Sequence, residues 1–344
     1  MLGANTVPIE SLYSQVGRIP HAEIIRRAEA TLKRGLPSVA HIAGKYRGKL
    51  IIAGGGPSLT DTLPDIRRQL RLSKTTKVAA VNRTHDFLLK KGLKPDFGVL
   101  IDPKPWVANY MTPTKGETHC LGAKLDEKTW QRFAGHPQVY HWHNLELAEE
   151  RDRIASIGTD FAIIPGQSTV GLRSIPLGFA LGFRKFELHG LDCNRRSGAG
   201  HAYQKFTTAE KVTFNPESDL GHQIFYVSAK GFETRYYDGT SHMARQLGEF
   251  KNLIAEYREL ERRGQEPCDI RVAGDSAMGY LAAIMGLHVN ETYNESPHTM
   301  PKTGCLTERE LGIQDPTEGI TIQFSDLCEP VQFDPVGVAL KAIA

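Results

Sequence analysis

The stretch that decides the fold of this chain is residues 50–59, which read LIIAGGGPSL. Its aliphatic start, bounded by turn residues, predicts a buried β-strand, and a helical pattern follows at 60–70. Glycines in such a loop can take positive φ and let the backbone approach a ligand closely. Free N–H groups at a helix start favour an anion, and a serine there can act as the N-cap. The sequence therefore predicts a phosphate-binding loop made of Gly54, Gly55, Gly56, Pro57 and Ser58.

Two known nucleotide-binding motifs are excluded by the residues of this loop. No Gly-Lys-Ser/Thr sequence follows the glycines, so the stretch is not a Walker loop. Leu59 stands where the third glycine of Gly-x-Gly-x-x-Gly would be. A tight strand-to-helix turn that binds nothing remains the alternative.

The composition is that of an ordinary globular chain. It has 344 residues, of which 40% are hydrophobic and 24% charged, and this length suits one large domain or two ordinary ones. A formal net charge of +3 does not indicate nucleic-acid binding. We expect no membrane helix, because no apolar run reaches about 18 residues. Scattered cysteines and an N-terminus without a signal-peptide pattern predict a cytoplasmic protein with reduced thiols.

Short apolar strands alternate with helical segments along most of the chain. Strands are expected at 77–82, 97–101, 119–122, 138–142, 161–164, 185–189 and 269–273. Helices are expected at 23–33, 84–91, 126–133, 169–181, 242–263 and 277–286. This alternation predicts a Rossmann-like, doubly wound α/β fold, with a mostly parallel sheet covered by helices on both faces.

The same pattern suggests three segments. Residues 1–48 are predicted to be a helical N-terminal preface, and 49–289 a nucleotide-binding transferase domain. Within that domain, 194–240 lacks clear periodicity and is predicted to be a lid or binding loop. Residues 290–344 are predicted to be an irregular C-terminal extension with one strand at 320–324.

Polar side chains follow three of the expected strands. Asn82, Asp102 and Asp192 stand at these strand ends, and ligands of parallel α/β sheets bind at the carboxyl ends of the strands. We therefore expect them to share one rim with the glycine loop. The carboxylates can orient a ribose, act as a base or hold a metal-bridged phosphate, and Asn82 can bind a base or ribose. Stabilisation of the local turns is the alternative for all three.

An ordered set of short motifs resembles the MptE-like family. Besides the glycine loop, the motifs are AVN at 80–82, GLKPDF at 92–97, IDP at 101–103, GLD at 190–192 and GHA at 200–202. The resemblance covers residues 49–286. This family contains archaeal 6-hydroxymethylpterin diphosphokinases and bacterial motility-accessory-factor glycosyltransferases, and the latter are similar in fold to CMP-sialic-acid-dependent sialyltransferases. The resemblance implies a nucleotide-dependent transferase.

The glycosyltransferase branch of the family has a Gly-x-Asp turn, a glycine-bearing loop and then His-Ala, matched here by Asp192 and His201. The resemblance implies that His201 is a general acid or base, a role that suits the ordinary pKa of histidine. Arg195 and Arg196 would suit a diphosphate leaving group, because guanidinium groups bind phosphate well. Tyr203 could donate a further hydrogen bond to it. Solvated loop side chains are the alternative.

Two further groups of polar residues have weaker signals. Ser168 and Thr169 open the helix expected at 169–181, and they either cap it or add donors to a bound nucleotide. His141 and His143 have no carboxylate or cysteine at ligand spacing, so we expect a structural role for them.

The leading hypothesis is a glycosyltransferase with a CMP- or UDP-type nucleotide sugar as a small-molecule donor. The glycine loop would hold the phosphate, Asn82 and Asp102 the nucleoside, and no permanently bound cofactor is expected. The alternative is diphosphoryl transfer from ATP to a pterin-like alcohol, with Mg²⁺ held by Asp102 and Asp192. A non-catalytic nucleotide-binding module is the third hypothesis. The sequence identifies no acceptor.

Overall fold

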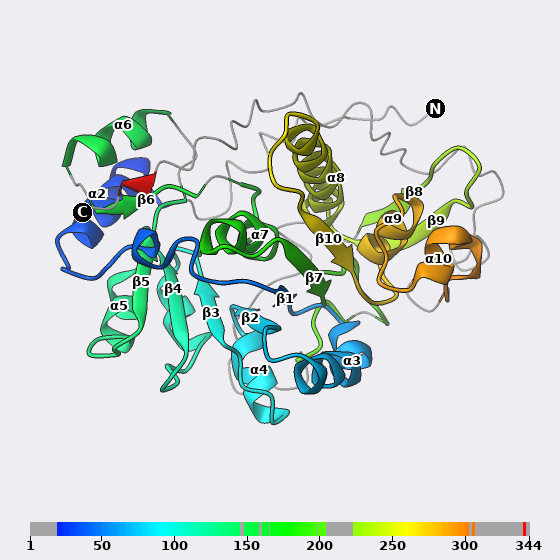
Figure 1. The fold of residues 1–344 in the computed structure, drawn as a ribbon, viewed down its shortest axis with the longest axis horizontal. Helices are drawn as coiled ribbons and strands as arrows, with labels where there is room; N and C mark the ends of the chain where they lie inside the picture. Colours follow the sequence, from blue (N-terminus) through cyan, green and yellow to red (C-terminus); the bar gives the residue numbers. More distant parts are fainter. Residues whose placement is uncertain are drawn as a thin grey trace.

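A seven-stranded parallel sheet forms the centre of the molecule (Figure 1). The computed structural model describes residues 19–144, 148–157, 160–164, 166–197, 199–203, 223–302, 305–306 and 340–341. In sheet order the strands are β10 (Asp269–Val272), β7 (Lys185–His189), β1 (Lys49–Ala53), β2 (Lys77–Val81), β3 (Phe97–Leu100), β4 (Thr118–Gly122) and β5 (Val139–Trp142). Every neighbouring pair is parallel. The chain winds from β1 in both directions, which confirms the predicted doubly wound α/β fold.

Helices cover both faces of this sheet. The α-helices are α2 (His21–Leu32), α3 (Leu59–Leu72), α4 (Thr84–Lys90), α5 (Glu127–Arg132), α6 (Ala148–Ile157), α7 (Val170–Leu181), α8 (Ser241–Arg262), α9 (Ala277–Ile284) and α10 (Glu291–Glu295). The 3₁₀ turns are η1 (Val39–Ile42), η2 (Pro105–Asn109) and η4 (Pro297–Thr299). In Figure 1, α7 and α8 lie on one side of the sheet, and α3 and α4 lie on the other.

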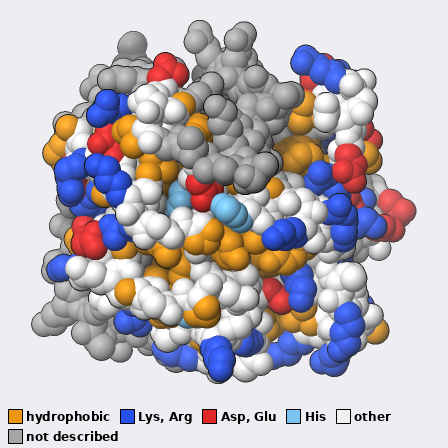
Figure 2. All heavy atoms as spheres, turned by 60° about the vertical axis from the view of Figure 1, so that its left-hand side comes forward, with side chains coloured by type: hydrophobic (Ala, Val, Ile, Leu, Met, Phe, Trp, Pro, Cys, Tyr) orange, Lys and Arg blue, Asp and Glu red, His pale blue; other side chains and the backbone are white. Residues whose placement is uncertain are grey.

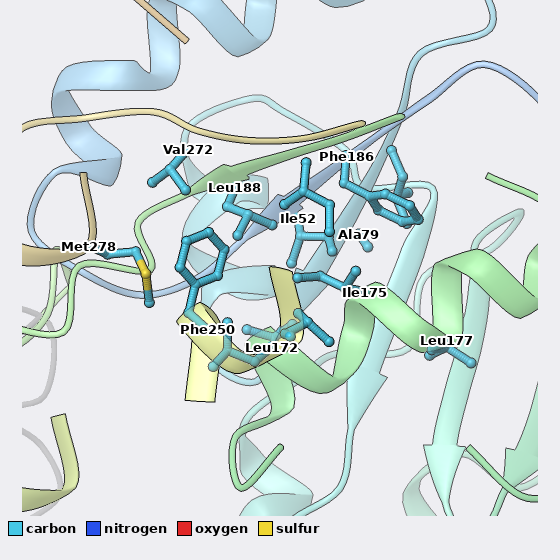
Figure 3. Close-up of a cluster of buried hydrophobic side chains, with 14 of the residues drawn as sticks. Ile52, Ala79, Leu172, Ile175, Leu177, Phe186, Leu188, Phe250, Val272 and Met278 are labelled. Atoms are coloured by element: carbon cyan, nitrogen blue, oxygen red, sulfur yellow. The ribbon is translucent and has the colours of Figure 1, made fainter. Parts of the chain in front are cut away.

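The sequence of the central strand β1 is almost entirely apolar because both faces of the strand are buried. Ile52 packs into the large core on the α7 and α8 side, together with Ile175 and Phe250 (Figure 3). Ile51 and Ala53 point to the opposite face and pack against residues of α3 and α4. A parallel strand buried on both faces has no position for an exposed polar side chain, so the run LIIA is continuous.

The stretch 194–240 contains two strands that the sequence analysis did not predict. β8 (Gln223–Val227) and β9 (Arg235–Gly239) form an antiparallel pair separate from the main sheet. The rings of Phe225 and Tyr237 stack at 5.9 Å between centroids and are buried. The expectation of an irregular stretch was wrong for these residues, because aromatic strand formers there stand among glycines and polar residues.

The expected strand at 161–164 is shorter and lies outside the main sheet. β6 (Phe161–Ala162) pairs with β11 (Leu340–Lys341) in antiparallel fashion. The strand expected at 320–324 falls outside the described residues. The predicted preface contains α2, which is anchored by a hydrogen bond from Thr31 Oγ1 to the carbonyl of Ala123 at 2.9 Å. The segment boundaries at 48 and 289 stay a prediction.

The surface carries charges of both signs. On the face shown in Figure 2, hydrophobic side chains form a band across the middle, and lysine and arginine side chains lie mostly around it. Within the described parts of the chain, no helix is both long enough and apolar enough to span a bilayer.

Candidate functional site

The carboxyl edge of the sheet brings together the loops that follow four adjacent strands. Strands β7, β1, β2 and β3 are neighbours in this order. Asp192, Asn82 and Asp102 lie within three residues of the ends of β7, β2 and β3, and the glycine loop begins directly after β1. The predicted site residues therefore share one edge of the sheet, as the strand order requires.

The glycine loop packs directly against the loop after β7. The N–H of Gly54 donates to the carbonyl of His189 at 2.8 Å, and that of Gly56 donates to Gly190 at 2.7 Å. A Cβ on Gly54 would lie 2.5 Å from the oxygen of Gly190, and one on Gly56 would lie 2.6 Å from Cγ of Asp192. Close packing of two loops thus requires glycine here. Positive φ is found at Gly190 (+64°) and at neither of these two positions.

Two hydrogen bonds join Ser58 to Asp192 at this edge. The N–H of Ser58 donates to Oδ2 of Asp192 at 2.6 Å, and its hydroxyl donates to Oδ1. Both side chains are buried. Burial raises the pKa of Asp192 to about 6, although the hydrogen bonds from Ser58 oppose this shift. Ser58 stands at the N-cap position of α3, but its hydroxyl does not cap the helix as predicted.

These bonds change what the loop can offer to a phosphate. Gly54, Gly56 and Ser58 donate their N–H groups within the protein, and Pro57 has none. The N–H of Gly55 is the loop donor for which the described residues provide no acceptor. An anion at this edge would therefore be held mainly by side chains, together with the N–H of Gly55 and the dipole of α3.

Residues 201–203 lie across the glycine loop. The N–H of Ala202 donates to the carbonyl of Gly55 at 2.9 Å. A Cβ on Gly55 would come within 2.7 Å of the ring of Tyr203, so this glycine makes room for the aromatic ring. The rings of His201 and Tyr203 are stacked, with centroids 5.0 Å apart and planes at 9°. The structure thus brings both predicted residues to the loop.

The environment keeps His201 and Tyr203 uncharged at neutral pH. His201 is exposed, but desolvation by the surrounding loops lowers its pKa, against a hydrogen bond with the backbone of Gly55. The nearby cations Arg83 and Arg195 lower it further. Burial raises the pKa of Tyr203 to about 12. A neutral imidazole can accept a proton and a neutral phenol can donate a hydrogen bond, so the pair has the protonation states that transfer to a hydroxyl requires.

Arg83 and Tyr110 are residues of this edge that the sequence analysis missed. Arg83 directly follows Asn82, and its guanidinium carbon lies 4.4 Å from the ring centroid of Tyr110. Arg83 also acts electrostatically on the hydroxyls of Tyr110 and Tyr203, lowering the pKa of each against the larger effect of burial. The available signal was a basic residue immediately after a polar strand end.

Asn82 has an unusual backbone and a buried oxygen without a hydrogen bond. Its φ is +50°, in the left-handed region that asparagine tolerates better than most residues. Its side-chain Oδ1 is buried and has no hydrogen-bond partner within the described part of the chain. A buried acceptor of this kind normally has a partner, so a bound group with an N–H or O–H donor would satisfy it.

Asp102 is partly buried after β3. Its Oδ1 accepts a hydrogen bond from the N–H of Lys104 at 3.0 Å, so it stabilises its own turn. Burial raises the pKa of Asp102, against that hydrogen bond and the charge of Lys104.

The two predicted arginines have different surroundings. Arg196 forms an ion pair with Asp61 on α3 and donates to the carbonyl of Asp275 at 2.7 Å. It therefore ties its loop to two neighbouring segments. The backbone N–H of Arg195 donates to Asp238 at 2.8 Å, and its side-chain charge reaches His201.

Ser168 and Thr169 are both engaged at the start of α7. Thr169 is the N-cap, because its hydroxyl accepts from the N–H of Leu172 at 3.3 Å. Ser168 donates its N–H and its hydroxyl to Glu249 of α8, at 3.0 and 2.8 Å. Of the two predicted roles, capping is carried out by Thr169 rather than Ser168.

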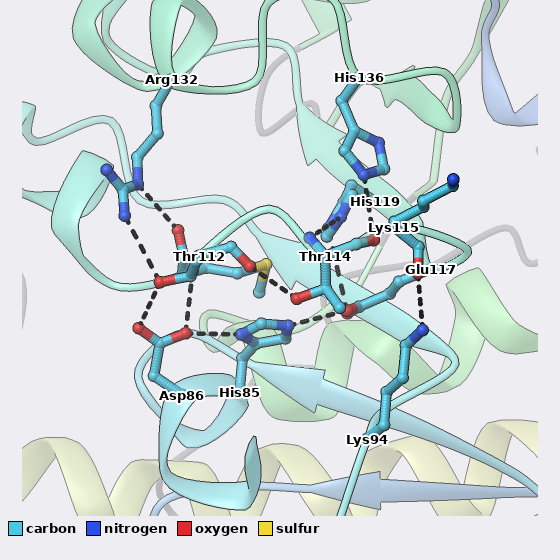
Figure 4. Close-up of polar contacts among 11 residues, drawn as sticks. His85, Asp86, Lys94, Thr112, Thr114, Lys115, Glu117, His119, Arg132 and His136 are labelled. Atoms are coloured by element: carbon cyan, nitrogen blue, oxygen red, sulfur yellow. Dashed lines mark hydrogen bonds and ion pairs between the residues drawn. The ribbon is translucent and has the colours of Figure 1, made fainter. Parts of the chain in front are cut away.

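A buried polar network lies under the loops that follow β3 (Figure 4). His85 is fully buried and contacts Asp86 at 2.7 Å and Glu117 at 2.9 Å through its two ring nitrogens. Burial lowers its pKa, but the hydrogen bonds to the two carboxylates outweigh this effect and the pKa is raised to about 9. His85 is therefore a buried cation at neutral pH.

The histidines predicted to be structural are also buried. Burial lowers the pKa of His141 to about 4 and that of His143 to about 3, so both rings are neutral. Among the residues described, no group of three or more histidine, cysteine, aspartate or glutamate side chains is arranged to hold a metal ion.

A comparison with protein-family models assigns the chain to a family. The model of the family described as "6-hydroxymethylpterin diphosphokinase MptE-like" matches residues 24–198, just over half of the chain. The chain belongs to the MptE-like family. This match includes the glycine loop, Asn82, Asp102 and Asp192, whereas His201 lies just beyond it. Membership of this family points to a transferase.

A comparison with solved structures found a partial match to a larger protein. A MAf glycosyltransferase from Magnetospirillum magneticum AMB-1 matches with a TM-score of 0.45 and 16% sequence identity. The match covers 69% of this chain and 34% of that one, so the MptE-like chain corresponds to about a third of the glycosyltransferase. No curated protein sequence matches the chain.

Proposed function

We propose that this MptE-like protein is a glycosyltransferase that uses a nucleotide-activated sugar of the CMP or UDP type. The observation that carries the proposal is the segment 201–203 on the glycine loop, which brings a neutral His201 and a protonated Tyr203 beside Arg83. An acceptor of protons, a hydrogen-bond donor and a fixed positive charge are the groups that such a transfer needs at one point.

In the proposed reaction, His201 accepts the proton of the acceptor hydroxyl. The acceptor oxygen forms a bond to the anomeric carbon of the sugar, while the bond from that carbon to the donor phosphate breaks. The nucleotide leaves with the electron pair and one additional negative charge. Arg83, Arg195 and Tyr203 would stabilise that charge, because charge-assisted hydrogen bonds to phosphate are strong. The unpaired oxygen of Asn82 would accept a hydrogen bond from the nucleoside.

The two rim carboxylates do not fit a shared magnesium site. Asp102 and Asp192 follow β3 and β7, which are three strand spacings apart in the sheet, or about 14 Å at the usual spacing of neighbouring strands. Both oxygens of Asp192 already accept hydrogen bonds from Ser58. We therefore derive no step through a metal bridged by these two residues.

The second candidate is diphosphoryl transfer from ATP to a pterin-like alcohol. Membership of the family favours it, since the family is described by a 6-hydroxymethylpterin diphosphokinase. The same arginines and Tyr203 would then hold the β- and γ-phosphates, and His201 would accept the proton of the alcohol. A nucleotide-binding module without catalysis is the third candidate.

Thermal unfolding with added nucleotides distinguishes these candidates. A ligand that binds only the folded state raises the melting temperature. We expect CMP or UDP to raise it equally with and without EDTA. A rise with ATP that EDTA abolishes would favour the diphosphokinase, whereas absence of any shift would contradict all three candidates.

Variants of the same edge add a check on catalysis. His201→Ala should retain the nucleotide-induced shift and lose transfer, measured as release of free nucleotide from the sugar donor in the presence of acceptor alcohols. Asn82→Ala should reduce the shift itself. If the shift is retained but neither wild type nor any variant turns over a donor, the binding module is the better description.

A further inference from the structure

Trp106 is the exposed tryptophan of the chain, and it stands next to the candidate site. Trp106 is 47% exposed, whereas Trp130 and Trp142 are 4% and 0% exposed. It lies on η2, which begins three residues after Asp102. Exposing so large an apolar ring to water is unfavourable, which makes its position at the edge of a ligand site informative.

The Trp106 indole is flanked by other side chains of the same edge and carried by a buried turn. Trp106 and Arg83 both lie close enough to the hydroxyl of Tyr110 to lower its pKa, against the larger effect of burial. The ammonium of Lys104 lies 5.8 Å from the centroid of the Trp106 ring. Val107, the next residue, is fully buried and fixes the 3₁₀ turn in the core. A ring held in this way can bind a flat partner at a small cost in conformational entropy.

Neighbouring side chains connect Trp106 to the glycine loop. Tyr110 and Arg83 are electrostatic neighbours of Tyr203, whose ring covers Gly55. Trp106 thus lies beyond Tyr110, on the side of the rim that follows β2 and β3. The unpaired oxygen of Asn82 belongs to the same side.

We propose that Trp106 is the surface on which the base of the nucleotide stacks. Every nucleobase has a π-face, and stacking on an aromatic side chain needs no particular base. The amide oxygen of Asn82 would accept a hydrogen bond from an N–H group of the base, and the cations Arg83 and Lys104 would strengthen the stack. This inference rests on the proposed function, since it assumes that a nucleotide binds at this edge.

The test compares ligands that have a base with one that lacks it. Isothermal titration of the full chain with CMP, UMP, AMP and ribose 5-phosphate gives the affinity of each. Trp106→Ala should weaken binding of the nucleoside monophosphates roughly fivefold to 100-fold, with ribose 5-phosphate unchanged. Trp106→Tyr should retain most of the affinity. Leu72→Ala, which removes an apolar side chain that is 75% exposed on α3, should change neither.

Fluorescence provides an independent measurement. Because the other two tryptophans are buried, acrylamide should quench mainly Trp106, and saturating CMP or UMP should protect it. Unchanged nucleotide affinity in Trp106→Ala would overturn the inference and leave the proposed function standing. An equal loss of affinity for ribose 5-phosphate in Trp106→Ala would also overturn the inference, because it would show that Trp106 contacts the sugar or shapes the site. If the wild type binds no nucleotide, the proposed function and the inference fail together.

Discussion

The carboxylate of Asp192 accepts hydrogen bonds from both the N–H and the hydroxyl of Ser58, a residue 134 positions earlier in the chain. This bond ties the loop after β7 to the loop after β1. The N–H of Ser58, which the sequence analysis expected to bind a phosphate, is therefore already used by Asp192. Asp192 therefore acts first as a positioning residue for the glycine loop.

Asp192→Asn and Ser58→Ala are each expected to lower the free energy of unfolding by about 1–3 kcal/mol, because each leaves a buried partner unsatisfied. Urea unfolding of both single variants and of the double variant measures the coupling. The double variant should lose clearly less unfolding free energy than the two single variants lose together. Asp102→Asn is the matched control, since among the described residues Asp102 accepts a hydrogen bond from its own turn alone. Losses of stability that add up strictly in the double variant would contradict the coupling.

Gly55→Ala is expected to displace the ring of Tyr203, because the new Cβ would lie 2.7 Å from it. The strain should lower the free energy of unfolding by about 1–3 kcal/mol and reduce nucleotide-induced stabilisation. Gly200→Ala is the control in the neighbouring segment, since a Cβ there meets no described atom within 4 Å. Equal nucleotide affinity in wild type and Gly55→Ala would show that Tyr203 need not cover the loop.

His201→Ala should lower kcat by about 10²- to 10⁴-fold, the usual contribution of a general base, with little change in donor affinity. Because the pKa of His201 is lowered below its ordinary value of 6.5, the ring is mostly neutral at pH 6.5, and kcat/KM should fall as the pH drops through that lowered pKa. The pH profile of kcat/KM should therefore have an acid limb below pH 6.5.

Asp192 has a pKa of about 6 and could produce a similar limb. The profile of Asp192→Asn separates the two groups. It should retain the limb if His201 is the base, and a profile that becomes flat in Asp192→Asn would assign the limb to Asp192 instead.

The buried cation His85 predicts a loss of stability at alkaline pH. Its pKa is raised to about 9 in the folded chain, above the ordinary value of 6.5, so the unfolded chain loses the proton first. The stabilisation is complete below pH 6.5 and is lost as the pH rises through 9. Urea unfolding between pH 6 and 10 measures it, and the difference between wild type and His85→Gln should shrink towards pH 10. A difference that does not vary with pH would contradict a charged His85.

The start of α7 predicts an effect on stability rather than on binding. Thr169→Ala removes the N-cap bond to Leu172 and should cost about 0.5–2 kcal/mol. Thr169→Ser keeps the hydroxyl and should cost much less. Nucleotide-induced shifts should be similar in both variants, and a selective loss of the shift in Thr169→Ala would restore the predicted role in nucleotide binding.

Part of the site could be predicted because it follows from sheet topology. Asn82, Asp102 and the glycine loop were assigned to one rim from strand ends alone, since parallel strands place their carboxyl ends on the same edge. The strands β8 and β9 were missed because their residues show no regular alternation. Arg83 and Tyr110 were missed because their importance comes from contact with each other and with Tyr203, which a linear pattern does not show.

The sequence by itself determined the doubly wound sheet, the order of its elements and the family to which the chain belongs. These depend on local hydrophobic periodicity and short motifs, both of which are written along the chain. Only the tertiary structure decided that the N–H groups of the glycine loop are largely used by the loop after β7. Only it brought His201 and Tyr203 onto Gly55. The physical reason is that hydrogen bonding and close packing between segments over a hundred residues apart depend on how the strands are ordered in space.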